Sequence, residues 1–200
     1  MNDKTTKTLI INSARTLFLE KGYENTPVEE ICDLSGMAKG TFFYHFETKQ
    51  YLVEYLLDIQ FEEMMAQVKK VISECANVYD KLTAFVMMLI TTDAMPPESA
   101  QYFKQEPEWF FKLYDDARYK YFYPQIYEIV REGEYTGVFR LKNMEIVANM
   151  LFLGINSFLH YHYNKMKEDN NYREEALSGM DEILSKVLGV KANAFRLAQV

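Results

Sequence analysis

Apolar residues recur along the chain at the spacing of one helical face, beginning close to the N-terminus. The first predicted helix is marked by four positions that share such a face: Ile10, Ala14, Leu17 and Phe18. Gly22 stands where a helix of this length would end, because glycine adopts the left-handed conformation of a helix C-cap at little cost.

The sequence Thr-Pro-Val-Glu at 26–29 predicts the start of a second, short helix. Thr26 is expected to be the N-cap, Pro27 the first helical residue, and Glu29 the partner that completes a capping box. The apolar side of this helix is expected to consist of Val28, Ile31, Cys32 and Leu34. Gly36 follows closely and predicts a tight turn.

A third helix must begin within two or three residues of that turn. Phe42 and Phe46 are four positions apart, so both can pack back onto the first two helices. This arrangement leaves an outward face consisting of Lys39, Gly40, Thr41, Tyr44 and His45. A helix, a short helix, a glycine turn and a second short helix together describe a helix-turn-helix unit.

Helical periodicity continues through the rest of the chain. Thr48 is a predicted N-cap for a helix over about 51–75, and a further helix is expected over about 80–93, ahead of Pro96-Pro97. An aromatic-rich segment over 108–130 contains Pro124, which should kink or split it. Residues 144–164 are apolar on nearly every side, and the next segment carries an apolar stripe. The predicted fold class is therefore all-α.

Composition and charge narrow the possible functions. The chain has 200 residues, 48% of them hydrophobic, which is enough to bury a core. Two widely separated cysteines suggest neither a disulfide framework nor a thiolate zinc site, and no signal peptide or membrane-spanning stretch is evident. We therefore expect a soluble, cytoplasmic protein. Motifs typical of hydrolases, nucleotide-binding enzymes and metalloproteases are absent from the sequence, so we expect no enzymatic activity.

The net charge of −7 argues against indiscriminate binding of nucleic acid. The charge is unevenly placed, however, because residues 1–50 carry six Lys and Arg against seven Asp and Glu and are close to neutral. Specific DNA binding through hydroxyl groups, a few lysines and helix N-termini remains compatible with this charge.

Two motifs carry a specific resemblance. The first is I-x-x-S-A-x-x-L-F-x-x-x-G-Y-x-x-T at 10–26, and the second is G-M-A-K-G-T-F-F-Y-H-F-x-x-K at 36–49. With these motifs, residues 9–52 resemble the DNA-binding domain of the TetR family of bacterial transcriptional regulators. The resemblance implies a homodimer of all-helical subunits. Residues 1–50 would form a three-helix DNA-binding domain, and residues 51–200 a larger domain for dimerisation and effector binding.

The resemblance and the chemistry of the side chains together assign candidate DNA contacts. They are Thr26, Lys39, Gly40, Thr41, Tyr44, His45 and Lys49. Lys39 and Thr41 would reach base edges or nearby phosphates, Gly40 would let the backbone approach the groove, and the others would contact phosphates. Phe43 and Ala38 depart from the family pattern, since neither can donate a hydrogen bond to phosphate.

The C-terminal domain offers candidates for two further sites. An effector pocket rich in Met and aromatic residues would include Met88, Phe103, Trp109, Tyr114 and Phe152, although a plain core fits the same spacing. A four-helix dimer interface would include Leu151, Phe158, Met180, Leu184 and Val187. The acidic residues Glu106, Glu108, Asp115 and Asp116 fit either a cationic ligand or a solvated face.

The sequence therefore favours a ligand-responsive transcriptional regulator, most simply a repressor. Its partners would be double-stranded operator DNA, a second copy of itself and a small lipophilic or aromatic effector. No cofactor, membrane partner or metal is expected, and His160 and His162, two residues apart, do not share a helical face. The alternative hypothesis is a helical small-molecule-binding or adaptor protein of the same fold that does not recognise DNA.

Overall fold

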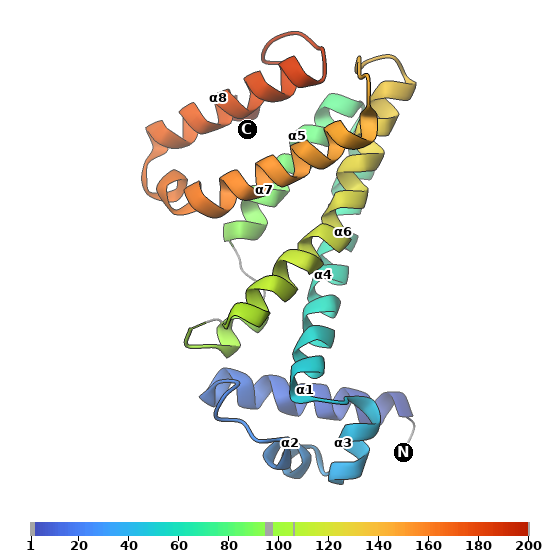
Figure 1. Ribbon diagram of the computed structural model, residues 1–200, viewed down its shortest axis with the longest axis vertical. Coiled ribbons are helices and arrows are strands. Elements are labelled where there is room, and N and C mark those ends of the chain that lie inside the picture. Colours follow the sequence, from blue (N-terminus) through green and yellow to red (C-terminus); the bar gives the residue numbers. More distant parts are fainter. Residues whose placement is uncertain (1–2, 95–97, 106, 200) are drawn as a thin grey trace. The chain divides into compact units, whose positions relative to one another are not determined.

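The computed structural model describes residues 3–94, 98–105 and 107–199 (Figure 1). The described residues form helices and no strand, which confirms the all-α class. The helices are α1 (Asp3–Lys21), α2 (Val28–Ser35), α3 (Lys39–His45), α4 (Lys49–Glu74), α5 (Val78–Ala94), η1 (Glu98–Tyr102), α6 (Glu108–Tyr135), α7 (Met144–Glu168), α8 (Asn170–Val187) and η2 (Leu197–Gln199). Pro96, Pro97 and Glu106 lie outside the described residues. None of the helices described is both long and apolar enough to cross a bilayer.

The chain forms two compact units. Unit 1 contains Met1–Glu63 and Pro96–Ala117, and unit 2 contains Met64–Met95 and Arg118–Val200. These limits differ from the 1–50 and 51–200 division expected from the sequence, because a segment far along the chain packs with the N-terminal helices. The assignment of separate functions to 1–50 and 51–200 stays a prediction.

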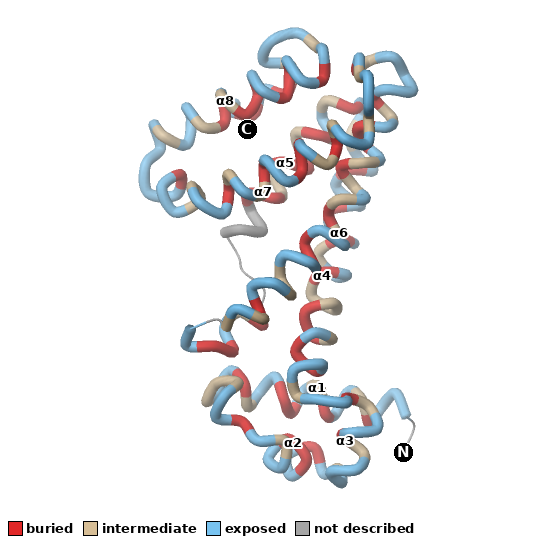
Figure 2. Tube along the Cα trace, in the orientation of Figure 1, coloured by how far each residue is buried: buried red, intermediate tan, exposed pale blue. Residues whose placement is uncertain are grey.

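The core of unit 1 is shared between the N-terminal helices and the segment around η1. Phe18 of α1, Phe42 of α3 and Phe46 are fully buried in this core. Tyr102 of η1 is also fully buried, and Phe110 at the start of α6 is almost so. Buried and exposed positions alternate along each helix of the unit (Figure 2). The three short helices therefore complete their core with aromatic rings that come from 98–110.

A polar cluster holds η1 against α1. Arg15 donates two hydrogen bonds to the carboxylate of Glu98, at 2.9 and 2.6 Å, and the Tyr102 hydroxyl donates a third, at 2.7 Å. The backbone N–H of Tyr23 donates to the carbonyl of Tyr102 at 2.7 Å. The hydrogen bonds from Arg15 lower the pKa of the Glu98 carboxyl. Because its charge is satisfied in this way, the carboxylate stabilises the contact at neutral pH.

Three local sequence signals for the ends of helices are confirmed. Gly22 and Gly36 follow α1 and α2 with φ angles of +88° and +69°, in the left-handed region that glycine tolerates best. The side chain of Thr48 accepts a hydrogen bond from the N–H of Tyr51 at 2.9 Å. Thr48 is therefore the N-cap of α4, as predicted.

The prediction that Thr26 caps α2 was wrong. Helix α2 begins at Val28, its N-cap is Pro27, and no side chain caps it. The Thr26 hydroxyl instead donates to the carbonyl of Gly22 at 2.8 Å, and the residue is fully buried. It satisfies a carbonyl just beyond α1 rather than an N–H of α2. Leu34, expected on the apolar side of α2, is 54% exposed, because Ile31 and Cys32 already cover the buried face.

Unit 2 contains α5, α7, α8 and the C-terminal segment. Asn143 and Asp169 cap α7 and α8 through hydrogen bonds from backbone N–H groups. Asp181 of α8 is 3% exposed and accepts hydrogen bonds from the Ser185 hydroxyl and from the N–H of Leu197. This buried carboxylate fastens the C-terminal segment to α8.

Pro124 does not split α6, one of the two outcomes expected from the sequence, and the kink stays a prediction. The helix continues from Glu108 to Tyr135 with Pro124 inside it. Phe122 and Ile126, on either side of the proline, are 1% and 0% exposed. Their burial within unit 2 offsets the one backbone hydrogen bond that proline removes.

The insertion of η1 into the core predicts a large loss of stability on truncation. Tyr102→Ala should lower the free energy of unfolding by roughly 3 to 5 kcal/mol, as for other buried aromatic residues, measured by urea denaturation. Tyr135→Ala is the matched control and should change little, because Tyr135 is 92% exposed. Equal effects of the two substitutions would contradict the shared core.

Candidate functional site

Helix α3 has one buried and one exposed face, as predicted. Phe42 is fully buried, whereas Lys39 and Gly40 are exposed and Tyr44 is 78% exposed. Thr41 is half-buried. The exposed side chains supply a cation and a phenolic hydroxyl, both of which can donate hydrogen bonds to phosphate or to base edges.

His45 does not face outward as expected. Its side chain is 6% exposed, and Nε2 lies 3.6 Å from Oδ1 of Asp3. His45 follows Phe42 by three positions, so it shares the inward side of α3, and its ring lies 6.4 Å from that of Phe46. The imidazole therefore contributes to packing in this structure.

Lys39 is paired across the turn between α2 and α3. Its ammonium group forms an ion pair with the carboxylate of Glu29, and both side chains are more than half exposed. The hydrogen bond between them raises the pKa of Lys39 and lowers the pKa of Glu29. A nucleic acid would have to compete with this carboxylate for the cation.

Gly40 is not required by the packing of the protein itself. A Cβ atom added there would have no heavy atom within 4 Å, and its φ angle is not in the left-handed region. Alanine would therefore fit and would favour the helix. The missing side chain leaves an open patch on the exposed face of α3.

Lys49 points into unit 1. Its ammonium group donates to the carbonyls of Tyr23 and Thr26, at 2.6 and 2.8 Å, and lies 4.0 Å from the centre of the Tyr23 ring. Burial lowers the pKa of Lys49. Two of its three N–H donors thus hold the turn between α1 and α2. The Thr26 hydroxyl likewise has a partner within unit 1, the carbonyl of Gly22.

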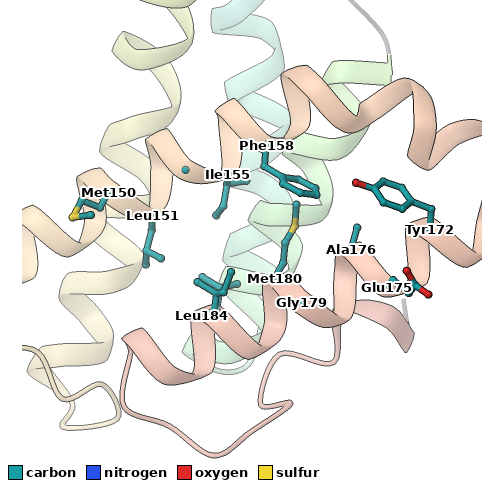
Figure 3. A pocket seen from close by; sticks show the side chains of 12 residues that line it. Met150, Leu151, Ile155, Phe158, Tyr172, Glu175, Ala176, Gly179, Met180 and Leu184 are labelled. Atoms are coloured by element: carbon teal, nitrogen blue, oxygen red, sulfur yellow. The ribbon is translucent and has the colours of Figure 1, made fainter.

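An apolar groove of about 450 Å³ lies between α7 and α8 in unit 2 (Figure 3). Phe158 and Ile155 on α7 point toward the side of Met180 on α8 across it. Four of the five residues predicted for the dimer interface line this groove, namely Leu151, Phe158, Met180 and Leu184. The fifth, Val187, is 42% exposed on α8. The structure thus brings four of the five residues together within one chain, and their role in a dimer interface stays a prediction.

The residues predicted to bind an effector do not form one cluster. Phe103, Trp109 and Tyr114 belong to unit 1, where the rings of Phe103 and Trp109 lie 5.5 Å apart. Met88 and Phe152 belong to unit 2, where Phe152 is 1% exposed. None of the five lines the groove between α7 and α8. Their role in ligand binding stays a prediction.

The acidic residues at the start of the aromatic-rich helix α6 are exposed to solvent. Glu108, Asp115 and Asp116 are exposed, and Asp116 pairs with Lys112 one turn away at 2.6 Å. This arrangement agrees with a solvated acidic face. The other interpretation that the sequence left open, a site for a cationic ligand, stays untested.

Comparison with known proteins agrees with this geometry. Residues 10–56 match the family model for bacterial regulatory proteins of the tetR family. The transcriptional regulator QacR of Staphylococcus aureus is 33% identical over 91 residues, which cover 46% of this chain and 48% of QacR. Residues 10–56 are therefore a TetR-family N-terminal region.

Other TetR-family relatives match over shorter regions. The repressor KstR2 of Mycolicibacterium smegmatis is 26% identical over 78 residues, which cover 39% of this chain and 38% of KstR2. The match thus spans less than half the length of either curated relative. RolR bound to resorcinol shares the fold over 98% of this chain and 94% of its own, with a TM-score of 0.65 and 18% identity.

Two polar contacts between distant segments were not predicted from the sequence. The Arg15–Glu98 pair joins residues 83 positions apart, and no local pattern marks it. Arg118 of α6 is 7% exposed and donates to the side chain of Asn156 at 2.6 Å. An arginine directly before the aromatic-rich stretch 119–123 was the available signal for a buried polar contact.

The contacts of Lys49 predict a structural effect of its removal. Lys49→Met should lower the free energy of unfolding by about 1 to 3 kcal/mol, because two backbone carbonyls lose a charged donor. Urea denaturation measures this loss, and Lys69→Met, at an exposed position of α4, is the control. Equal stability of the two variants would show that the hydrogen bonds of Lys49 do not stabilise the turn.

Proposed function

We propose that this protein is a cytoplasmic transcriptional repressor that binds a pseudo-palindromic operator as a homodimer through α3. The observation that carries the proposal is the exposed face of α3, on which Lys39, Gly40 and Tyr44 lie opposite a buried core. A helix anchored in this way can enter the major groove without losing its own packing. QacR and KstR2, which resemble this chain, are named as a transcriptional regulator and a transcriptional repressor.

The proposed dimer uses the surface around the groove between α7 and α8. Ile146, Met150 and Leu153 on α7, and Ile183 and Val187 on α8, are large apolar residues that are 42–70% exposed. A second copy would cover these side chains and bring four helices together. Two recognition helices about 34 Å apart could then reach successive major grooves.

The proposed effector is a small lipophilic or aromatic molecule. The chain contains 11 Met and 14 Phe residues, and such side chains suit an adaptable apolar pocket. RolR has been solved with resorcinol, and a structurally similar FadR of Bacillus subtilis with stearoyl-CoA. Binding that favours a subunit arrangement with the wrong spacing of recognition helices would weaken operator binding.

A test of DNA readout uses Lys39. The operator is selected from random duplexes with the full-length protein, and binding is measured by mobility shift. Lys39→Ala should weaken operator binding roughly 5- to 150-fold and leave random DNA nearly unaffected, as for a base contact. An equal loss on both kinds of DNA would assign Lys39 to the backbone instead.

Glu29→Gln is the matched variant, because it removes the carboxylate partner and keeps the cation. Operator binding should strengthen, since Lys39 becomes free and a negative charge leaves the interface. If the wild-type protein selects no sequence at all, the proposal is wrong and the adaptor hypothesis takes its place.

A test of the proposed dimer uses Val187, which is exposed in one subunit. Val187→Asp should leave the subunit folded but shift its sedimentation to that of a monomer and abolish operator binding. Leu184 is unsuitable, because it is 2% exposed and a charge there would disrupt its own subunit. Ser178→Asp, on the opposite side of α8, should remain dimeric. A wild-type monomer at micromolar concentration would refute the dimer.

A further inference from the structure

The exposed face of α3 includes an aromatic side chain without a polar atom, that of Phe43. Phe43 is 43% exposed, although the preceding Phe42 is fully buried. The two rings meet in a T-shaped arrangement, edge to face, with centroids 5.3 Å apart and planes at 84°. Phe42 thus supports the Phe43 ring, while much of the surface of Phe43 remains open to solvent.

The surroundings of Phe43 distinguish it from other exposed apolar residues. Single apolar side chains at a surface are common and need no special explanation. Phe43, however, follows Lys39 by four positions and Gly40 by three, so it shares their side of the helix. A Cβ added to Gly40 would have no neighbour within 4 Å, so no side chain at that position screens the ring.

The chemistry of the major groove indicates what such a ring could contact. A phenyl group can donate no hydrogen bond to phosphate or to a base edge. The apolar group that the major groove presents is the C5-methyl of thymine, and phenylalanine is among the side chains that contact it. A ring placed among polar contacts on this face would gain by covering that methyl group.

We propose that Phe43 is a specificity-determining residue that reads the methyl group of a thymine in the operator. This inference rests on the proposed function and goes beyond it by naming the base and the atom that are recognised. Phe43 follows Lys39 by four residues, or about 6 Å along the helix axis. The thymine should therefore lie within about two base pairs of the base that Lys39 contacts, given a rise of roughly 3.4 Å per base pair.

The test replaces thymine by uracil at one position of each half-site at a time. Uracil keeps the hydrogen-bonding groups of thymine and lacks only the methyl group. At one pair of symmetry-related positions the wild-type protein should bind about fourfold more weakly per half-site, the value for one methyl-sized group withdrawn from water. The other thymines should show smaller losses.

Substitutions at Phe43 then assign the effect to its ring. Phe43→Ala should bind the thymine and uracil operators equally at that position, and Phe43→Leu should still prefer thymine. Phe43→Gln keeps a long side chain but makes it polar, so it should lose the preference for thymine over uracil. This variant replaces Phe43→Ala in the test if the alanine variant is unstable. Phe111→Ala is the matched control, since Phe111 is 46% exposed in unit 1 but lies on α6.

Two results would overturn the inference while leaving the proposed function intact. One is a wild-type protein that binds its operator but is insensitive to every single replacement of thymine. The other is a preference for thymine that persists in Phe43→Ala and Phe43→Gln. A wild-type protein that binds no operator would instead overturn the proposed function itself, and this inference with it.

Discussion

The shared core of unit 1 is the constraint on which the rest of the structure depends. Helices α1, α2 and α3 share their core with a distant segment, because Tyr102 and Phe110 fill part of its interior. The Arg15–Glu98 pair fixes the same segment from outside. Helix α3 can present an exposed face because its other face rests on this core.

The same constraint links the two ends of α6. This helix places Phe110 in the core of unit 1, and farther along it places Phe122 against Phe85 in unit 2. One continuous helix thus contributes buried rings to both units.

In the motif shared with TetR proteins, some polar side chains hold unit 1 together and others are exposed on α3. Thr26, His45 and Lys49 were expected at the DNA surface, but their polar groups hold parts of unit 1 together. The exposed chemistry of α3 reduces to Lys39, Tyr44, an open patch at Gly40 and the ring of Phe43. Few charges are needed on such a surface, which is compatible with a net charge of −7.

The sequence by itself determined the helical class and several of the helix ends. Gly22, Gly36 and Thr48 act on backbone groups a few residues away, so their effects follow from local chemistry. Phe42 and Phe46 could be assigned to the core because residues four apart share a helical face. The TetR-type motifs were likewise local, and they identified the family before any contact was known.

Only the tertiary structure decided how the polar groups of Thr26, Lys49 and Glu98 are used. Each has several possible partners, and the choice depends on which carbonyl, ring or cation a distant element brings close. Glu98 meets Arg15 across 83 residues, and Lys49 meets the carbonyl of Tyr23 across 26. Local periodicity carries no information about such distances, because hydrogen bonds and ion pairs form between groups that folding brings together.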